Sequence, residues 1–124
     1  MTKFTVDRQT WLRGRGQGTL RSESGEMCCL GFFCNQIGGV SLKSLMRFTY
    51  PASLVNANRL TDEEKKKIGV LLEDNTGYAG YAFDSLLGTN AARINDNINI
   101  DDGERESQLT ALFAEEGFEV EFVN

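Results

Sequence analysis

The stretch that most constrains the fold is residues 27–37, an apolar segment that contains all three cysteines of the chain. Its large apolar side chains recur at spacings of three, three, one and three residues, which is the periodicity of an α-helix. These positions are Met27, Leu30, Phe33, Cys34 and Ile37. Glycines lie on both sides, and Gly38 is placed to end the helix. The pattern predicts a mostly buried helix between two glycine stops, with Met27 at its exposed start.

The cysteines of this segment are Cys28, Cys29 and Cys34. A structural zinc site needs four ligands at characteristic spacings, and a thioredoxin-like redox site needs two cysteines separated by two residues. Neither pattern is present, and we predict no metal site. Free cysteine often behaves as a small hydrophobic residue, so we interpret the three thiols as core residues. A reactive thiol and a metal site completed between protomers remain as alternatives.

The length and composition of the chain predict one globular domain over residues 1–124. With 40% hydrophobic and 25% charged residues, the chain resembles ordinary proteins that build a hydrophobic core. No run of about 18 apolar residues predicts a membrane helix. The first residues lack the apolar region of a secretory signal, so we expect a cytoplasmic protein with reduced thiols and no membrane partner.

The charge of the chain is negative overall and unevenly distributed. A formal net charge of -5 disfavours long nucleic acids, which are bound through many lysines and arginines. It does not disfavour a small phosphorylated ligand, for which a few local arginines suffice. The charged residues of the range 1–22 are basic except for Asp7, whereas those of the range 101–121 are acidic except for Arg105. Either both regions are solvated surface, or the two ends meet within a chain or between protomers.

The absence of histidine removes the commonest general base and the commonest metal ligand. The adjacent carboxylates Asp101 and Asp102 do not share a helix face, so helix capping explains them better than acid–base catalysis. These features disfavour an enzyme, and we predict no catalytic residues and no cofactor.

Alternating patterns at the two ends of the chain, residues 3–6 and 118–124, predict two strands that lie beside each other. Asp7 is expected to cap a short helix through residues 8–12. Further helices are predicted over 60–74, with a capping box from Thr61 and Glu64, and over 82–96. Residues 97–117 are predicted to hold another helix, capped by Asp101 or Asp102 and ended by Gly117. The fold class is α+β, with a small antiparallel sheet that includes the N- and C-terminal strands and helices packed on one face.

Residues 92–96 carry the side chains best suited to a nucleotide. Arg93 offers a planar fork for phosphate, and the amide of Asn95 offers donors and acceptors for a base edge or a ribose. Phe83 offers an aromatic face for stacking, as do Tyr78 and Tyr81. Helix capping and exposed charge explain the same residues without any ligand, and the composition alone does not separate these interpretations.

Several stretches resemble a family of small phage proteins, the Thoeris anti-defence sponge proteins of the first type described. The similar stretches are FTVDRQTWLRG (4–14), GEMCCLGF (25–32), INDN (94–97) and ERESQLTALFAEEGFEVEFV (104–123). The resemblance covers roughly half of the chain, at both ends and in the middle, and residues 40–92 contribute nothing to it.

The resemblance implies a binding protein that sequesters a cyclic ADP-ribose isomer of the gcADPR type without degrading it. A bacterial TIR-domain immune enzyme makes this second messenger on infection, and the Thoeris effector then stays inactive. Some members also bind cyclic oligonucleotide messengers in separate pockets. The family forms homodimers that can assemble into hexamers, with ligand pockets at protomer contacts, and such a protein acts in the host cytoplasm during infection.

The resemblance also assigns ligand-binding residues. Four of them lie in the similar stretches and are carried over from the family: Met27, Asn95, Asp96 and Arg105. Three more ligand-binding residues are chosen for their chemistry. These further residues are Phe83, Arg93 and Arg13. The alternative function is a protein-interaction module that inhibits a host protein directly through its acidic C-terminal helix.

Overall fold

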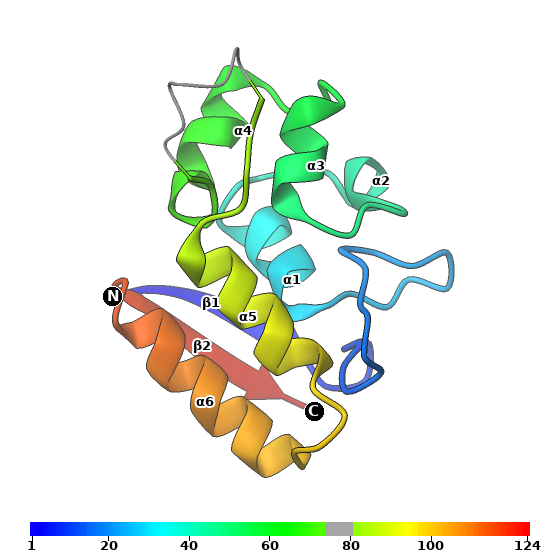
Figure 1. Ribbon diagram of the computed structural model, residues 1–124, viewed down its shortest axis with the longest axis vertical. Helices are drawn as coiled ribbons and strands as arrows, with labels where there is room; N and C mark the ends of the chain where they lie inside the picture. The colour runs from blue at the N-terminus through cyan, green and yellow to red at the C-terminus, as the bar shows by residue number, and fades with distance from the viewer. Residues whose placement is uncertain (74–80) are drawn as a thin grey trace.

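The computed structural model describes residues 1–73 and 81–124. Its elements, in chain order, are β1 (Thr2–Asp7), α1 (Cys29–Gln36), α2 (Leu42–Leu45), α3 (Pro51–Asn56), α4 (Asp62–Lys67), the 3-10 helix η1 (Gly69–Leu71), α5 (Leu86–Asp96), α6 (Asp102–Ala114) and β2 (Phe118–Val123) (Figure 1). The described part of the chain is mainly helical and holds one pair of strands. The predicted α+β class is confirmed.

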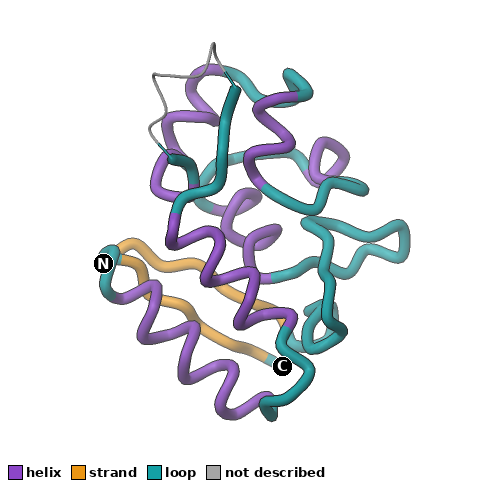
Figure 2. The backbone as a smooth tube through the Cα atoms, viewed as in Figure 1, coloured by secondary structure: helices purple, strands orange, loops and turns teal. Residues whose placement is uncertain are grey.

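The two strands come from the two ends of the chain, as predicted, and they pair over their whole length (Figure 2). The register runs from Thr2 opposite Phe118 to Asp7 opposite Val123, and the strands are parallel. The predicted antiparallel direction is therefore wrong. Alternating side chains define the faces of a strand and not its direction. Parallel strands need a long crossover connection, and here the intervening helices supply it.

The sheet buries one face and exposes the other. Phe4, Val6 and Val120 are buried, whereas Glu119 and Glu121 are exposed on the opposite face. Helix α1 contacts β1, and α6 contacts β2. The helices next to the sheet pack on its apolar face, as the alternation in sequence predicts.

Helix α1 lies at the centre of the core (Figure 1). The Phe33 ring contacts Phe4 edge-on at 5.2 Å and Phe118 at 5.0 Å, and it stacks on Phe113 at 5.8 Å between ring centroids. One aromatic cluster therefore joins both strands to α1 and α6.

The interpretation of the cysteines as core residues is confirmed, because all three are buried and unbonded to one another. Burial raises the pKa of the Cys28 thiol to about 12. It also raises the pKa of Cys29 and of Cys34, and the nearby Cys28 adds to the effect. A thiol that stays protonated at neutral pH is a poor nucleophile.

Three local predictions need correction. The helix expected at 8–12 does not form, because Asp7 accepts backbone N–H groups of Gln9 and Thr10 in a turn. The helix predicted over 82–96 begins only at Leu86, where the Ser85 side chain caps it. The helix predicted over 60–74 starts with the expected capping box but ends at Lys67.

The basic N-terminal region and the acidic C-terminal region meet within the chain. Arg8 donates two hydrogen bonds to the Glu106 carboxylate, at 2.8 and 2.7 Å. Arg13 pairs with Asp102 at 3.0 Å, and Lys3 pairs with Glu121 at 3.2 Å. The interpretation that the ends meet is confirmed.

Gly31 lies where α1 passes the backbone of residue 20. A Cβ atom added at Gly31 would overlap the Leu20 carbonyl group, whereas one added at Gly69 would meet nothing within 4 Å. We expect Gly31→Ala to lower the free energy of unfolding by about 1–3 kcal/mol or more, because overpacking usually costs about 1–3 kcal/mol. Gly69→Ala is the matched control, and its unfolding midpoint in urea should equal or exceed that of the wild type. Equal midpoints for the two variants would contradict this packing.

The pairing of Asp102 predicts a dependence of stability on pH. The hydrogen bond from Arg13 holds the pKa of Asp102 below its ordinary value. The stabilisation that this ion pair gives the fold is therefore fully present at a pH above the ordinary pKa of an aspartate. It is lost as the pH falls through the lowered pKa of Asp102. Because the pair is half exposed, Asp102→Asn should cost about 0.5 kcal/mol or less at neutral pH.

Urea unfolding from about pH 6 to about pH 3 tests this expectation, since carboxylates titrate in that range. The difference between wild type and Asp102→Asn should shrink as the pH falls. Glu119→Gln removes an exposed carboxylate that has no ion pair among the described residues, and it should leave the pH profile unchanged. A pH-independent difference for Asp102→Asn would refute the role of the ion pair.

Candidate functional site

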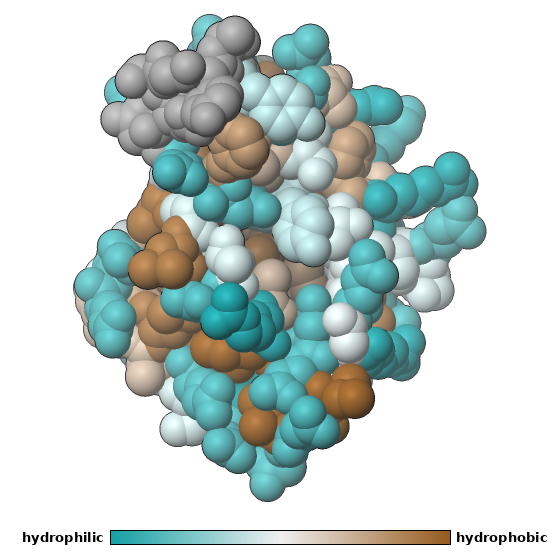
Figure 3. All heavy atoms as spheres, viewed as in Figure 1, coloured by the Kyte–Doolittle hydropathy of each residue, from teal (hydrophilic) through white to brown (hydrophobic). Residues whose placement is uncertain are grey.

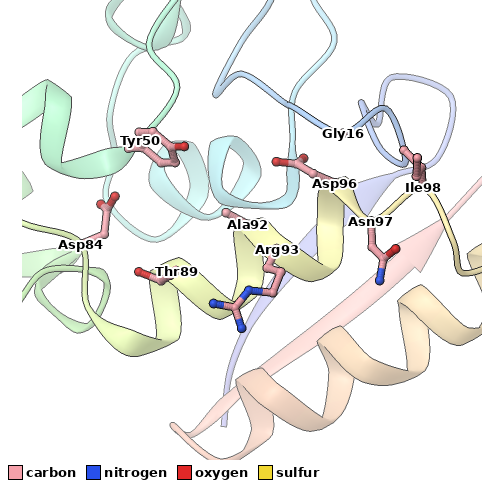
Figure 4. Close-up of a pocket in the computed structure, with 9 residues that line it drawn as sticks. All are labelled: Gly16, Tyr50, Asp84, Thr89, Ala92, Arg93, Asp96, Asn97 and Ile98. Carbon is pink, nitrogen blue, oxygen red and sulfur yellow. The ribbon is translucent and has the colours of Figure 1, made fainter.

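A cavity of about 460 Å³ runs along one side of α5, and we call it the α5 pocket (Figure 4). Four of the residues that line it belong to α5 and lie three or four positions apart, so they share one face of the helix: Thr89, Ala92, Arg93 and Asp96. The lining residues are Gly16, Tyr50, Asp84, Thr89, Ala92, Arg93, Asp96, Asn97 and Ile98. The pocket therefore combines one helix face with the start of α3 and the loop around Gly16.

Tyr50 is placed at the pocket by the proline that follows it. The residue before a proline avoids the helical conformation, and Tyr50 is extended, with φ -129° and ψ 147°. It is the N-cap of α3 but caps no backbone group with its side chain. The start of α3 is capped by Asp84 instead, because the Asp84 carboxylate accepts a hydrogen bond from the Ala52 N–H at 3.0 Å. This bond fixes the start of α3 next to the start of α5.

The side chains of the α5 pocket point in two directions. In Figure 4 the Tyr50 hydroxyl and the Asp96 carboxylate point toward the middle of the pocket from opposite sides, while the Arg93 and Asn97 side chains extend the other way. Arg93 is exposed and is the only cation among the described residues that line the pocket. No described residue forms an ion pair with it. Burial raises the pKa of Asp84 above its ordinary value.

A second, polar cavity of about 370 Å³ lies on the other side of Ile98, and we call it the arginine groove. It is lined by Arg8, Gln9, Trp11, Arg13, Gly14, Arg15, Glu26, Ile98, Ile100, Asp102 and Arg105. Most of its guanidinium groups have partners within the fold. Arg13 lies over the Trp11 ring at 4.6 Å and pairs with Asp102, whereas Arg15 is 3.9 Å from Glu26 and largely exposed.

Asn95 is completely buried between the two cavities. Its carbonyl oxygen accepts the Trp11 indole N–H at 2.7 Å and the Cys29 backbone N–H at 3.0 Å. Its amide nitrogen donates to the Leu12 carbonyl at 2.9 Å and to the Asp96 carboxylate at 3.0 Å. These four bonds use the full hydrogen-bonding capacity of the side chain. The residue is a structural junction with no group left for a ligand.

Arg105 is also buried, with 3% exposure. Its guanidinium donates to the carbonyl oxygens of Ile94 at 2.9 Å and Asn97 at 2.7 Å, and to that of Ile100 at 2.9 Å. The Ile94 carbonyl lies in the last turn of α5, where helical partners are missing, and the other two carbonyls lie just beyond the helix. Arg105 therefore joins α6 to the end of α5.

The structure does not bring the seven predicted site residues into one pocket. Arg93 and Asp96 line the α5 pocket, and Arg13 and Arg105 line the arginine groove. Asn95 is buried between the cavities. Met27 is 8% exposed and bridges to Trp11, so the expected exposed position is wrong. Its helix begins two residues later, at Cys29.

Phe83 lies before α5 rather than on it, and it is 40% exposed. Its ring is 5.6 Å from that of Tyr81. It precedes the pocket residue Asp84 but does not line the pocket itself. Its predicted role as the stacking aromatic stays a prediction. Tyr78, which also offered an aromatic face, lies outside the described residues.

Sequence reasoning missed Tyr50, Asp84 and Thr89. The sequence did carry one indication of the position of Tyr50. It precedes the single proline, and a residue in that place is expected to be extended and to lie at a helix start. Thr89 shares a helix face with Arg93 and Asp96, at spacings of four and three residues. Asp84 carried no local signal, because its role depends on the distant residue Ala52.

Comparisons with protein-family models, with curated proteins and with solved structures found no match to this chain. Among the described residues, no helix has the length and apolar character needed to cross a membrane. The same residues hold no group of three or more histidine, cysteine, aspartate or glutamate side chains that could bind a metal ion. The site must therefore be interpreted from its own geometry.

Replacing Asn95 by alanine should lower stability, because three buried backbone and indole groups would lose their partner. Each such group costs about 1–3 kcal/mol when left unsatisfied, so we expect the free energy of unfolding to fall by at least about 3 kcal/mol. Asn90→Ala is the matched control on α5, because the Asn90 side chain has no hydrogen-bond partner in the described parts of the chain and alanine favours the helix. Urea unfolding measures both, and a neutral Asn95→Ala variant would contradict the role of this junction.

Proposed function

We propose that this chain binds a small phosphorylated nucleotide in the α5 pocket and holds it without converting it. The observation that carries the proposal is that one cavity combines an aromatic residue, Tyr50, with an arginine, Arg93, that has no ionic partner among the described residues. A volume of about 460 Å³ lies within the usual range of small-molecule sites, about 300–1,000 Å³.

The chemistry of the lining suits the parts of a nucleotide. An aromatic ring offers a stacking face for a base. The planar guanidinium of Arg93 matches a phosphate group, and its exposure at the edge of the pocket leaves it accessible. The hydroxyl of Thr89 and the carboxylate of Asp96 are suited to the polar groups of a base or a ribose.

The same residues support binding without turnover. The chain has no histidine, and the lining includes no lysine or cysteine in the part of the chain that the structure describes. The three thiols lie in the core with raised pKa values. A nucleophile needs an adjacent base or a lowered pKa, and the lining residues offer Thr89 without a histidine or lysine beside it. The bound molecule would leave unchanged.

The ligand that we propose is a cyclic ADP-ribose isomer of the gcADPR type, made by a TIR-domain immune enzyme. The support for this particular nucleotide is the resemblance of four stretches of the chain to the Thoeris anti-defence sponge proteins of phages. In this proposal the protein acts in the host cytoplasm during infection and sequesters the messenger, so that the Thoeris effector stays inactive. A homodimer or hexamer would increase the number of pockets, and the same resemblance makes cyclic oligonucleotide messengers further candidate ligands.

The alternative function, inhibition of a host protein through the acidic helix α6, has less support. Asp102 and Glu106 on this helix already pair with Arg13 and Arg8. On the face seen in Figure 3, hydrophobic residues form scattered spots rather than one continuous patch. Protein interfaces usually centre on an apolar cluster of that kind.

The proposal predicts that a gcADPR-type isomer binds the wild-type protein and is recovered intact. Calorimetry measures the binding, and heat denaturation followed by chromatography identifies the released molecule. Arg93→Ala should weaken binding at least tenfold, about 1.4 kcal/mol, because no other described residue that lines the pocket is a cation.

Lys43→Ala is the control for the loss of one positive charge, because Lys43 is exposed on α2 and forms no ion pair among the described residues. Its affinity should equal that of the wild type. No binding at micromolar ligand would refute the proposal, and a converted product would indicate an enzyme instead. Wild-type affinity in Arg93→Ala would place the ligand outside the α5 pocket.

A further inference from the structure

Asp96 has one carboxylate oxygen that serves the fold and one that does not. Its Oδ1 accepts the hydrogen bond from the buried Asn95 amide at 3.0 Å. The other oxygen has no hydrogen-bond partner among the described residues. Asp96 is half-buried and lines the α5 pocket, so this oxygen belongs to a confined polar group rather than to a freely solvated one.

The orientation of this carboxylate is fixed from two sides. Asn95 cannot move without breaking its bonds to Trp11 and to the start of α1. On the other side, a Cβ atom added at Gly18 would lie 2.8 Å from Asp96 Oδ1, so the missing side chain of Gly18 leaves the room that the carboxylate occupies. The carboxylate is thus held in place before any ligand arrives, which lowers the entropic cost of binding.

The carboxylate points into the pocket opposite the Tyr50 hydroxyl (Figure 4). An ionised carboxylate only accepts hydrogen bonds. A ligand group that is itself an acceptor would face an unpaired negative charge, whereas an N–H or O–H group would complete the hydrogen bonding. A site built in this way rejects analogues that lack the donor, because its own polar group is then left unpaired.

We infer that Asp96 determines the ligand specificity of the α5 pocket by accepting a hydrogen bond from an N–H or O–H donor of the nucleotide, with Asn95 as its positioning residue. This inference rests on the proposed function and names the chemistry that the pocket selects. In a cyclic ADP-ribose isomer the donor is either the exocyclic amino group of adenine or a ribose hydroxyl. The phosphate groups are excluded from this end of the pocket by the charge of Asp96.

The competing explanation is that Asp96 serves only to hold Asn95. That role needs one acceptor oxygen, which asparagine at position 96 would also supply. It predicts no discrimination between ligands that differ by one donor. The two explanations therefore differ in the ratio of affinities for matched ligands, which a structural role does not change.

The experiment measures binding of three probes by calorimetry. They are a gcADPR-type isomer, its counterpart with purine in place of adenine, which lacks the exocyclic amino donor, and a deoxyribose counterpart, which lacks a hydroxyl. Wild-type protein should bind one counterpart at least tenfold more weakly than the parent, and the affected counterpart identifies the donor. Asp96→Asn should bind the parent at least tenfold more weakly and should lose most of that discrimination.

Glu119→Gln, which removes a carboxylate from the exposed face of the sheet, should keep the wild-type ratios. Urea unfolding of Asp96→Asn checks that the fold persists, and the wild-type ratios test the inference without any variant. Equal affinity of wild-type protein for all three probes would overturn this inference alone. Unchanged discrimination in a folded Asp96→Asn protein would do the same. Failure of the wild type to bind any probe would overturn the proposed function together with it.

Discussion

The four hydrogen bonds of the Asn95 side chain connect segments that are far apart in the sequence. They join the N-terminal region at Trp11 and Leu12, the start of α1 at Cys29, and the end of α5. Gly14 and Gly16 add backbone bonds to the carbonyls of Asn95 and Asp96, so the glycine-rich loop is fastened to the same helix end. Arg105 of α6 donates hydrogen bonds to the Ile94 and Asn95 carbonyls, so α6 is joined to the same helix end. Because buried polar groups are costly when unpaired, the relative positions of these elements depend on one amide.

Both candidate cavities take their shape from this junction. Asp96 on one side and Trp11 on the other are direct partners of Asn95, and each lines a different cavity. The two cavities also differ in the state of their arginines. Those of the arginine groove mostly have carboxylate or carbonyl partners, whereas Arg93 in the α5 pocket has no ionic partner among the described residues. A guanidinium that is already paired gains less from a phosphate than one that is not.

The elements with strong periodicity could be predicted from the sequence, because burial of one face determines which residues repeat. This is the case for α1 and for the two terminal strands. The capping box at Thr61 and the N-cap at Asp101 could also be predicted, because each depends on residues that are close together in the sequence. The direction of pairing between the strands could not be predicted, since it depends on the path of the whole chain. The absence of a helix after Asp7 has a similar cause, because Trp11 is committed to a bridge with Met27 and to Asn95.

The site was harder to predict than the fold. Asn95 and Arg105 were singled out for chemistry that suits a ligand, yet the same donors and acceptors are used to join elements of the fold. Sequence alone does not distinguish these uses, because both favour the same residue types. Tyr50 was missed because its importance comes from its place before Pro51 and opposite α5, which is a property of the tertiary structure.

The bond between Trp11 and Asn95 gives the protein an intrinsic optical probe. The chain has a single tryptophan, and its indole N–H is bonded to the amide that also holds Asp96. Arg13 lies over the indole ring as a cation. The emission of one chromophore therefore depends on the geometry of the junction between the two cavities, and small movements of that junction can be followed in solution without attaching a label.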